Sequence, residues 1–367
     1  MKILWLTNVP SPYRVDFFNE LGKSCDLMVL FEKKTSDERD KSWQIYQFLN
    51  FTGVFLNGKS VNTDTAFCPD VVKYIKKIKF DHIVVTNISS PTGMLAIQYM
   101  KIHRIPYWIE GDGGFAKSGN GVKEQIKHHF ISGAKGYFST SKVHDEYYLT
   151  YGAKPDRIYR YPFTSISKEY ILQAKTFSSD EKVILRRNLG MTEKSIILSV
   201  GRFSYQEGYG KGYDILMRLA EKLGADYGFY LVGDEPTEEF KRWKEEKRLD
   251  NIHFVGFKVS VELTRYYAAA DVFALLSRGE AWGLVINEAM AHGLPIVASD
   301  KCVAATELIE NGINGYILPL EDEKEIAEKF RLCIENRDSY GIASLKAIEK
   351  YTTEAMARKH AEILFGE

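Results

Sequence analysis

Two glutamates in the C-terminal half, Glu280 and Glu288, lie in the stretch of this sequence whose residue types and spacing are best suited to chemistry. Gly283 stands between them, and the pattern predicts a helix from Val285 to His292 that ends before Gly293. A carboxylate accepts hydrogen bonds from hydroxyl groups, and the free N–H groups at the start of a helix attract anionic oxygens. The stretch therefore suits a ligand that carries both hydroxyl groups and phosphates.

The spacing of the two glutamates has two interpretations. On one continuous helix, residues eight apart diverge by about 80° around the axis, and the pair would then be two solvated helix residues. The pattern instead predicts a strand at Val272–Leu276, a loop with Glu280, and a helix with Glu288. This arrangement allows both carboxylates to face one ligand.

A second group of residues supports an anionic ligand in the same half. Gly201 and Arg202 follow a strand predicted at Ile196–Val200, and Lys211 precedes a helix predicted at Tyr213–Leu223. A guanidinium and an ammonium group neutralise a diphosphate and stabilise it as it leaves. The alternative is that the two cations are surface charges beside a turn.

The sequence around the glutamates, E-A-W-G-L…E-A-M-A-H-G-L-P-I-V-A, resembles the large family of retaining glycosyltransferases with the GT-B fold and paired glutamates (glycosyltransferase family 4-like, group 1). The resemblance implies that Glu280 lies near the donor sugar, that Glu288 binds ribose hydroxyls, and that Arg202 and Lys211 contact the diphosphate. The separation of Arg202 and Lys211 is a few residues longer than in the family pattern. The resemblance also implies donor contacts by Gly201, by the loop Ala281, Trp282, Gly283 and Leu284, and by Phe257 and Lys258, where the base is bound.

Short apolar runs alternate with longer amphipathic stretches along all 367 residues, which is typical of parallel βαβ units. We therefore predict an α/β fold with two Rossmann-like domains whose parallel sheets face across a cleft, as in GT-B. The N-terminal, acceptor-side domain covers 1–165, and the C-terminal helix 352–367 can complete it. The nucleotide-sugar-binding domain covers 166–351. The segment from Pro162 to Lys194 carries no strand pattern and is interpreted as the crossover.

In the N-terminal half, two strand ends carry polar residues. The first is followed by a proline-containing turn with Tyr13 and Arg14, which we assign to the acceptor side or to a phosphate; a rigid turn is the alternative. The strand ending at Glu110 is followed by Asp112 among glycines. The family places a histidine near this point, so its resemblance implies that Asp112, or Glu110, takes the polar role there. The alternative is that the acid caps a helix.

The two halves differ in charge. Residues 1–160 contain 22 Lys and Arg against 16 Asp and Glu, and the remainder contains 27 against 33. The basic half suggests an anionic partner such as a membrane surface, with chance solvation as the alternative. The basic segments are 71–80 and 117–135, which suit either anionic lipid or a solvated amphipathic helix. Four separated cysteines without a CxxC pair argue against disulfides and zinc. We expect a cytoplasmic location, with membrane association on the cytoplasmic face as an option.

The resemblance implies a retaining transfer of sugar to a glycan or lipid-linked acceptor, in bacterial surface polysaccharide synthesis. The nucleotide sugar is a substrate, with UDP-sugar favoured over GDP- or ADP-sugar, and no cofactor is expected. The chain has no Asp-x-Asp pair, so we expect no metal. We also expect no nucleic acid partner. A nucleotide-sugar epimerase of the same fold and a catalytically silent sugar-binding protein remain alternatives. A nicotinamide-dependent oxidoreductase is disfavoured because no G-x-G-x-x-G follows the first strand.

Overall fold

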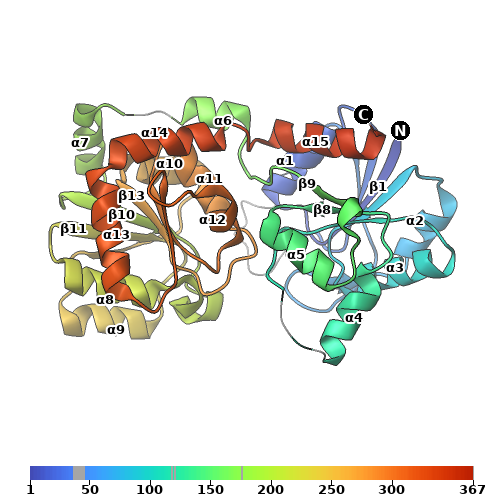
Figure 1. Cartoon of the computed structure of the whole chain (residues 1–367), viewed down its shortest axis with the longest axis horizontal. Coiled ribbons are helices and arrows are strands. Elements are labelled where there is room, and N and C mark those ends of the chain that lie inside the picture. Colours follow the sequence, from blue (N-terminus) through green and yellow to red (C-terminus); the bar gives the residue numbers. More distant parts are fainter. Residues whose placement is uncertain (36–45, 117–118, 120, 175–176, 367) are drawn as a thin grey trace. The chain divides into compact units, whose positions relative to one another are not determined.

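A computed structural model of the chain describes residues 1–35, 46–116, 119, 121–174 and 177–366. It consists of two compact units, which are treated separately below (Figure 1). Unit 1 comprises Met1–Ser165 and Tyr351–Glu367, and unit 2 comprises Ile166–Lys350. The chain therefore leaves unit 1 after residue 165 and returns to it for its last helix.

Unit 1 is built on a parallel sheet of seven strands in the order β3-β2-β1-β6-β7-β8-β9. A small antiparallel pair, β4–β5, lies outside this sheet. The strands are β1 (Lys2–Thr7), β2 (Asp26–Phe31), β3 (Thr52–Phe55), β4 (Lys59–Ser60), β5 (Ala66–Phe67), β6 (His82–Val85), β7 (Trp108–Glu110), β8 (Gly136–Ser139) and β9 (Ile158–Arg160). The helices are α1 (Pro12–Leu21), α2 (Val71–Lys77), α3 (Pro91–Ile102), α4 (Val122–Ile131), α5 (Lys142–Thr150), the short η2 (Pro155–Arg157) and α15 (Thr353–Phe365).

Unit 2 has a parallel sheet of six strands in the order β12-β11-β10-β13-β14-β15. The strands are β10 (Ser195–Val200), β11 (Tyr227–Val232), β12 (Ile252–Gly256), β13 (Val272–Leu275), β14 (Ile296–Ser299) and β15 (Gly315–Leu318). The helices are α6 (Lys168–Gln173), α7 (Ser179–Asn188), η3 (Tyr205–Lys211), α8 (Tyr213–Leu223), α9 (Glu238–Lys247), α10 (Ser260–Ala269), α11 (Leu284–Ala291), α12 (Val303–Leu308), α13 (Glu323–Glu335) and α14 (Arg337–Ile348).

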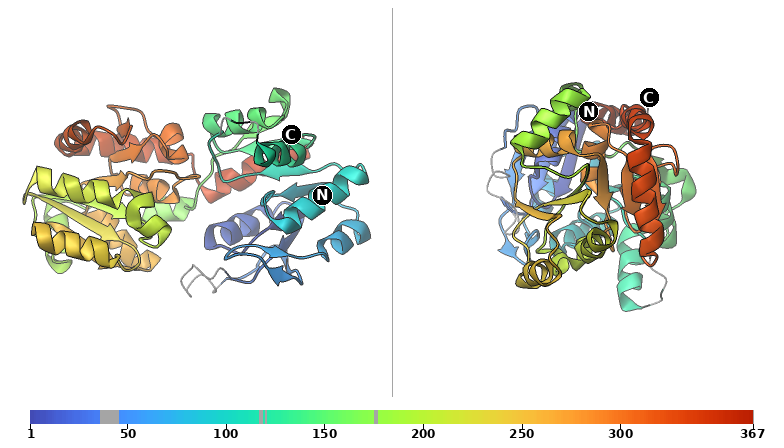
Figure 2. Two further views of the ribbon diagram at one scale, coloured as in Figure 1. Left: turned by 90° about the horizontal axis from the view of Figure 1, so that it is seen from below. Right: turned by 90° about the vertical axis from the view of Figure 1, so that its left-hand side faces the viewer.

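Each sheet is buried between helices, which lie on both of its faces in Figures 1 and 2. The central strands are accordingly apolar at nearly every position: in β1, five consecutive residues from Ile3 to Thr7 are buried, and β13 is buried throughout. Parallel strands covered on both faces carry such continuous apolar runs. The loops that leave the carboxyl ends of these strands are where ligands bind in open α/β sheets.

The fold differs from the sequence prediction in its less apolar elements. Tyr13 and Arg14 lie in helix α1 and not in a turn. The helix begins at Pro12, because proline suits the first turn of a helix, where its missing N–H costs nothing. The strands β3 and β9 at the two edges of the unit 1 sheet were not predicted. Each is short and mostly half-buried or exposed, so neither carries an apolar run. The crossover segment contains two helices, α6 and α7.

The last helix, α15, packs against α1 within unit 1 (Figure 1). Its buried residues include Met356, His360 and Leu364, which recur every four positions and so form one face of the helix. The His360 ring lies 4.8 Å from Phe17 and 5.7 Å from Trp5, measured between ring centroids. A segment far from the N-terminus in sequence thus completes the core of unit 1.

The basic segment 71–80 packs its apolar residues inward. Val71 and Ile75 are buried, and Tyr74 and Phe80 pack against the same core, while Lys73 and other lysines are exposed. Part of the second basic segment, including Lys117, lies outside the described residues. No helix in the described part of the chain has the length and apolar character needed to cross a bilayer.

We predict that Met356→Ala lowers the free energy of unfolding by about 2–5 kcal/mol, because a fully buried methionine leaves a cavity in the core shared by α1 and α15. Urea unfolding followed by circular dichroism measures this. Arg358→Ala is the control: it is on the exposed side of α15, with a single ion pair of 3.8 Å to Glu362, and should cost less than about 1 kcal/mol. Equal losses in the two variants would contradict the packing of α15.

Candidate functional site

The loop after β13 is held rigidly by the segment after β14. The backbone N–H of Glu280 donates to the carbonyl of Lys301 at 3.0 Å, and the N–H of Ala304 donates to the carbonyl of Trp282 at 2.9 Å. The Trp282 side chain is buried and its indole N–H donates to Asn287 at 2.8 Å. The ring of Trp282 therefore anchors the loop. Its predicted contact with the nucleotide sugar is accordingly assigned to its backbone.

Gly283 lies at the turn from this loop into α11, where its φ angle is 106°. A Cβ at this position would lie 2.8 Å from the sulfur of Cys302, so both the backbone conformation and the available space require glycine. The amide groups that open α11 follow directly. Helix starts of this kind attract anionic oxygens.

Glu280 and Lys211 are paired in unit 2. The Lys211 Nζ lies 2.5 Å from Oε2 of Glu280, and the hydroxyl of Ser277 lies 3.4 Å from the same oxygen. Both side chains of the pair are partly exposed, at 15% and 22%. Two predicted catalytic residues, 69 positions apart in sequence, are thus neighbours.

The aliphatic part of Lys211 runs along the backbone of Gly201. A Cβ on Gly201 would lie 3.1 Å from Cδ of Lys211, so glycine leaves the space for this approach. The extra residues between Arg202 and Lys211 form η3, in which Gln206 and Glu207 have left-handed backbone angles. This compact turn absorbs the longer separation and returns Lys211 to the end of β10.

Arg202 is half-buried and follows β10 directly. The carboxylate of Asp234, at the end of β11, accepts hydrogen bonds from the backbone N–H groups of Phe203 and Ser204. Asp234 therefore fixes the turn that carries Arg202. The bonding of one acid to two successive amides has no spacing signature in the sequence.

Glu288 is the fifth of the eight residues of α11 and is half-buried. Its Oε2 accepts a hydrogen bond of 3.0 Å from the hydroxyl of Tyr267. The Tyr267 ring stacks on His292, with ring centroids 5.4 Å apart and an angle of 16°. Glu280 is thus on a loop and Glu288 on a helix, as the sequence predicts, and their contact with a common ligand stays a prediction.

The two residues assigned to the base, Phe257 and Lys258, follow β12. The Phe257 side chain is 48% exposed. The Lys258 ammonium donates to the carbonyls of Val255 at 3.1 Å and Phe257 at 3.3 Å, so it closes its own turn. The turn itself contains Gly256 at a φ of 77°.

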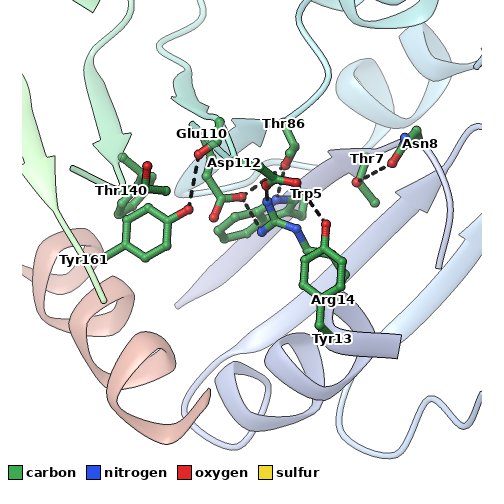
Figure 3. Close-up of polar contacts among 12 residues, drawn as sticks. Trp5, Thr7, Asn8, Tyr13, Arg14, Thr86, Glu110, Asp112, Thr140 and Tyr161 are labelled. Carbon is green, nitrogen blue, oxygen red and sulfur yellow. Dashed lines mark hydrogen bonds and ion pairs between the residues drawn. The ribbon is translucent and has the colours of Figure 1, made fainter. Parts of the chain in front are cut away.

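Unit 1 holds a cluster of charged side chains at the carboxyl ends of its strands (Figure 3). Arg14 donates to Glu110 Oε2 at 2.8 Å and to Asp112 Oδ1, and Tyr13 donates to Asp112 Oδ2 at 2.9 Å. Thr86 donates to Glu110 at 3.2 Å. Four of these five residues were separately predicted as acceptor-side or catalytic residues, and the structure joins them in one network.

Glu110 has a further partner that the sequence did not indicate. Its Oε1 lies 3.3 Å from Nε2 of His360, and both side chains are fully buried. Burial disfavours the charged form of Glu110, but Arg14 and His360 outweigh this and lower its pKa to about 2. The one signal in the sequence was a histidine in line with Met356 and Leu364 on the buried face of α15.

Burial separates the roles of the cluster members. Arg14 and Glu110 are 2% and 0% exposed in their side chains, whereas the Asp112 side chain is 36% exposed. The buried contacts of Arg14 and Glu110 indicate that both residues support the structure of the cluster. Their direct contact with a ligand stays a prediction. Asp112 presents its carboxylate at the surface while Arg14 and Tyr13 hold it in place.

We predict that Glu110→Gln lowers the free energy of unfolding by about 3 kcal/mol at pH 7, because the buried Arg14 guanidinium loses one of its two carboxylate partners and keeps only Asp112. The pKa of Glu110 is lower in the folded than in the unfolded chain, so its stabilisation is complete above about pH 4.3 and is lost as the pH falls towards 2. Denaturant unfolding at several pH values should show the variant and the unmodified protein converging at low pH. The exposed Glu146→Gln is the control, and a constant difference at all pH values would refute the assignment.

Comparison with known proteins adds the following. Residues 181–354 match the model of the family described as "Glycosyl transferases group 1". Unit 2 is similar to group 1 glycosyl transferases. An uncharacterized 41.2 kDa protein in the cps region of Klebsiella pneumoniae is 33% identical over 137 residues, which are 37% of this chain and 36% of that protein.

A longer match is the N,N'-diacetylbacillosaminyl-diphospho-undecaprenol alpha-1,3-N-acetylgalactosaminyltransferase of Campylobacter jejuni, 24% identical over 280 residues, 72% of this chain and 71% of that protein. Matches to the first three curated relatives cover 36%, 35% and 46% of their own lengths. Among solved structures, Anabaena HepE in complex with UDP aligns over 100% of both chains with a TM-score of 0.77 at 19% identity. The predicted GT-B fold class is thereby confirmed.

Proposed function

We propose that the protein is a retaining glycosyltransferase that transfers a sugar from a nucleoside diphosphate sugar to a glycan or lipid-linked acceptor. The observation that carries the proposal is the adjacency of Lys211, Glu280 and Gly201 at the strand ends of a unit that matches a glycosyltransferase family. A UDP-sugar is the favoured donor, supported by the UDP complex of HepE. The Klebsiella and Campylobacter relatives support a role in bacterial surface polysaccharide synthesis.

In the proposed reaction, negative charge builds on the diphosphate as the bond to the anomeric carbon breaks. Lys211 and Arg202 neutralise this charge, and the N–H groups that open α11 after Gly283 add further donors. Charge-assisted bonds to a phosphate oxygen are about twice as strong as neutral ones. These groups therefore stabilise the leaving group more than the bound substrate, which is what accelerates the reaction.

The ion pair of Lys211 with Glu280 has a consequence for donor binding. A diphosphate competes with the Glu280 carboxylate for the Lys211 ammonium. When Lys211 turns to the phosphates, Glu280 becomes an acceptor for sugar hydroxyls. The same pair thus holds both side chains in place before the donor binds. Glu288 is proposed to take the ribose hydroxyls.

On the acceptor side, we assign the polar role to Asp112. Arg14 and Tyr13 orient its carboxylate, and its partial exposure makes it accessible. A lipid-linked acceptor would bring unit 1 to the cytoplasmic face of a membrane. The exposed lysines of 71–80 support such a contact, whereas the apolar residues of that segment are already packed in the core.

The proposal is tested by incubating the protein with UDP-, GDP- and ADP-sugars and candidate acceptors, with and without EDTA. Nucleotide release and glycosylated product are both measured. Acceptor-dependent product with unchanged activity in EDTA is expected. An isomerised donor without acceptor would identify an epimerase, and binding without turnover would identify a silent sugar-binding protein.

We predict that Lys211→Ala and Arg202→Ala each lower kcat/KM about 100-fold or more, because each removes a preorganised charge from the leaving diphosphate. Steady-state kinetics with the identified donor measure this. Lys241→Ala, which removes an exposed lysine of α9 that pairs with Glu238, is the control. Activity retained in Lys211→Ala would exclude its proposed role.

For Glu288, we predict that replacement by alanine weakens UDP binding about tenfold or more, as expected for the loss of charged hydrogen bonds to ribose. Glu239→Ala is a matched control, because Glu239 also accepts a hydrogen bond from a tyrosine, Tyr209, but lies on α9. Titration calorimetry with UDP compares the two variants. Equal affinity in both would remove Glu288 from the donor site.

A further inference from the structure

Unit 2 contains a cavity of about 410 Å³ that is lined by residues of α7, α10 and α14. Ala270 and Asp271 directly precede β13, and Leu294 lies shortly before β14. The cavity is therefore at the amino ends of these strands, whereas the Glu280 loop leaves the carboxyl end of β13. Its volume lies within the range of small-molecule sites, about 300–1,000 Å³.

Positive charge exceeds negative charge in the cavity lining. Lys182, Arg186 and Arg337 face two acids, Asp271 and Asp338. The buried Asp271 lies 2.6 Å from Arg186 and 3.2 Å from Lys182, and it also accepts from the backbone N–H of Ile196 at 2.8 Å. Asp271 is thus already paired with these groups, and it neutralises the charge of Arg337 only weakly.

Arg337 makes only long ion pairs with the acids near it. Its guanidinium lies 3.6 Å from Asp271 and 3.8 Å from Asp338, and the side chain is 48% exposed. A guanidinium has five N–H donors in a planar fork that fits the oxygens of phosphate or carboxylate. An anionic group near Arg337 would meet these donors and the ammonium of Lys182.

Most of the remaining lining is apolar. Val183 on α7 and Ile342 on α14 are 55% and 68% exposed, and Leu345 and Phe177 line the same cavity. Exposed aliphatic side chains beside cations provide a surface for the hydrocarbon part of an amphiphile.

A buried polar group also lines the cavity. His292 is 9% exposed, and in the described part of the chain its Nδ1 has no hydrogen-bond partner, while Nε2 lies 3.3 Å from the Tyr170 hydroxyl. Burial lowers the pKa of His292 to about 4, so the ring is neutral at pH 7. An unsatisfied buried ring nitrogen is costly, so the position of His292 is fixed by its packing and by the contact of Nε2 with Tyr170.

We propose that this cavity is a second binding site, distinct from the donor site, for a phosphate or carboxylate carried on a short apolar group. Arg337 and Lys182 bind the anionic group, and Ile342 and Val183 contact the apolar group. The ligand chemistry is found both in free small molecules and at the headgroup of an anionic lipid.

The test is titration calorimetry of the whole protein with octyl phosphate below its micellar concentration, with inorganic phosphate for comparison. Octyl phosphate should bind at least tenfold more tightly than phosphate. Arg337→Gln should weaken octyl phosphate binding at least fivefold. Lys346→Gln is the matched control, because it removes the same charge from an exposed position of the same helix outside the cavity lining, and should leave binding unchanged.

A second variant, Ile342→Ser, keeps the test independent of charge. It replaces an exposed residue and should weaken octyl phosphate at least threefold without affecting inorganic phosphate. No binding of octyl phosphate, equal effects of Arg337→Gln and Lys346→Gln, or no advantage of octyl phosphate over phosphate would each overturn the proposal.

Vesicles containing phosphatidic acid distinguish the two sources of the ligand. Sedimentation with the vesicles that is lost in Arg337→Gln, together with octyl phosphate binding, supports a lipid headgroup. Octyl phosphate binding without sedimentation supports a free small molecule. Sedimentation without octyl phosphate binding overturns the cavity as the site.

Discussion

The ion pair between Lys211 and Glu280 is the contact on which the donor side of the molecule depends. It joins the turn after β10 to the loop after β13, and each side of the pair is fixed independently. Gly201 leaves room for the lysine chain, while the backbone bonds of the Glu280 loop to the segment after β14 hold the carboxylate. A charge that is already oriented costs little reorganisation when a charged ligand arrives.

Unit 1 likewise has paired charges at the carboxyl ends of its strands. Arg14 and Glu110 are buried as charges only because each has polar or charged partners, and one partner of Glu110, His360, comes from the last helix of the chain. The position of the partly exposed Asp112 therefore depends on the docking of α15 as well as on the neighbouring turn. A residue 250 positions away from Glu110 thereby supports the predicted acceptor side.

The sequence predicted the fully buried strands and helices well, but it did not predict the ion pairs between residues that are far apart in the sequence. The central strands and α8, whose observed bounds are those predicted, follow from continuous or amphipathic apolar patterns. The edge strands β3 and β9 lack such a pattern, and η3 requires left-handed angles at Gln206 and Glu207 that these residues do not signal. The candidate residues were found individually, but the partnership of Lys211 with Glu280 and of Arg14 with Glu110 is set by tertiary structure. Asp234 and His360 support the sites without belonging to any motif.

The central claim is that the phosphates of a nucleoside diphosphate displace the Glu280 carboxylate from the Lys211 ammonium. A crystal structure of the protein with bound UDP tests this most directly. The account predicts phosphate oxygens within hydrogen-bond distance of Lys211 Nζ, with the Glu280 carboxylate released from that ammonium. A structure in which UDP binds elsewhere, with the Lys211–Glu280 pair intact, would contradict it.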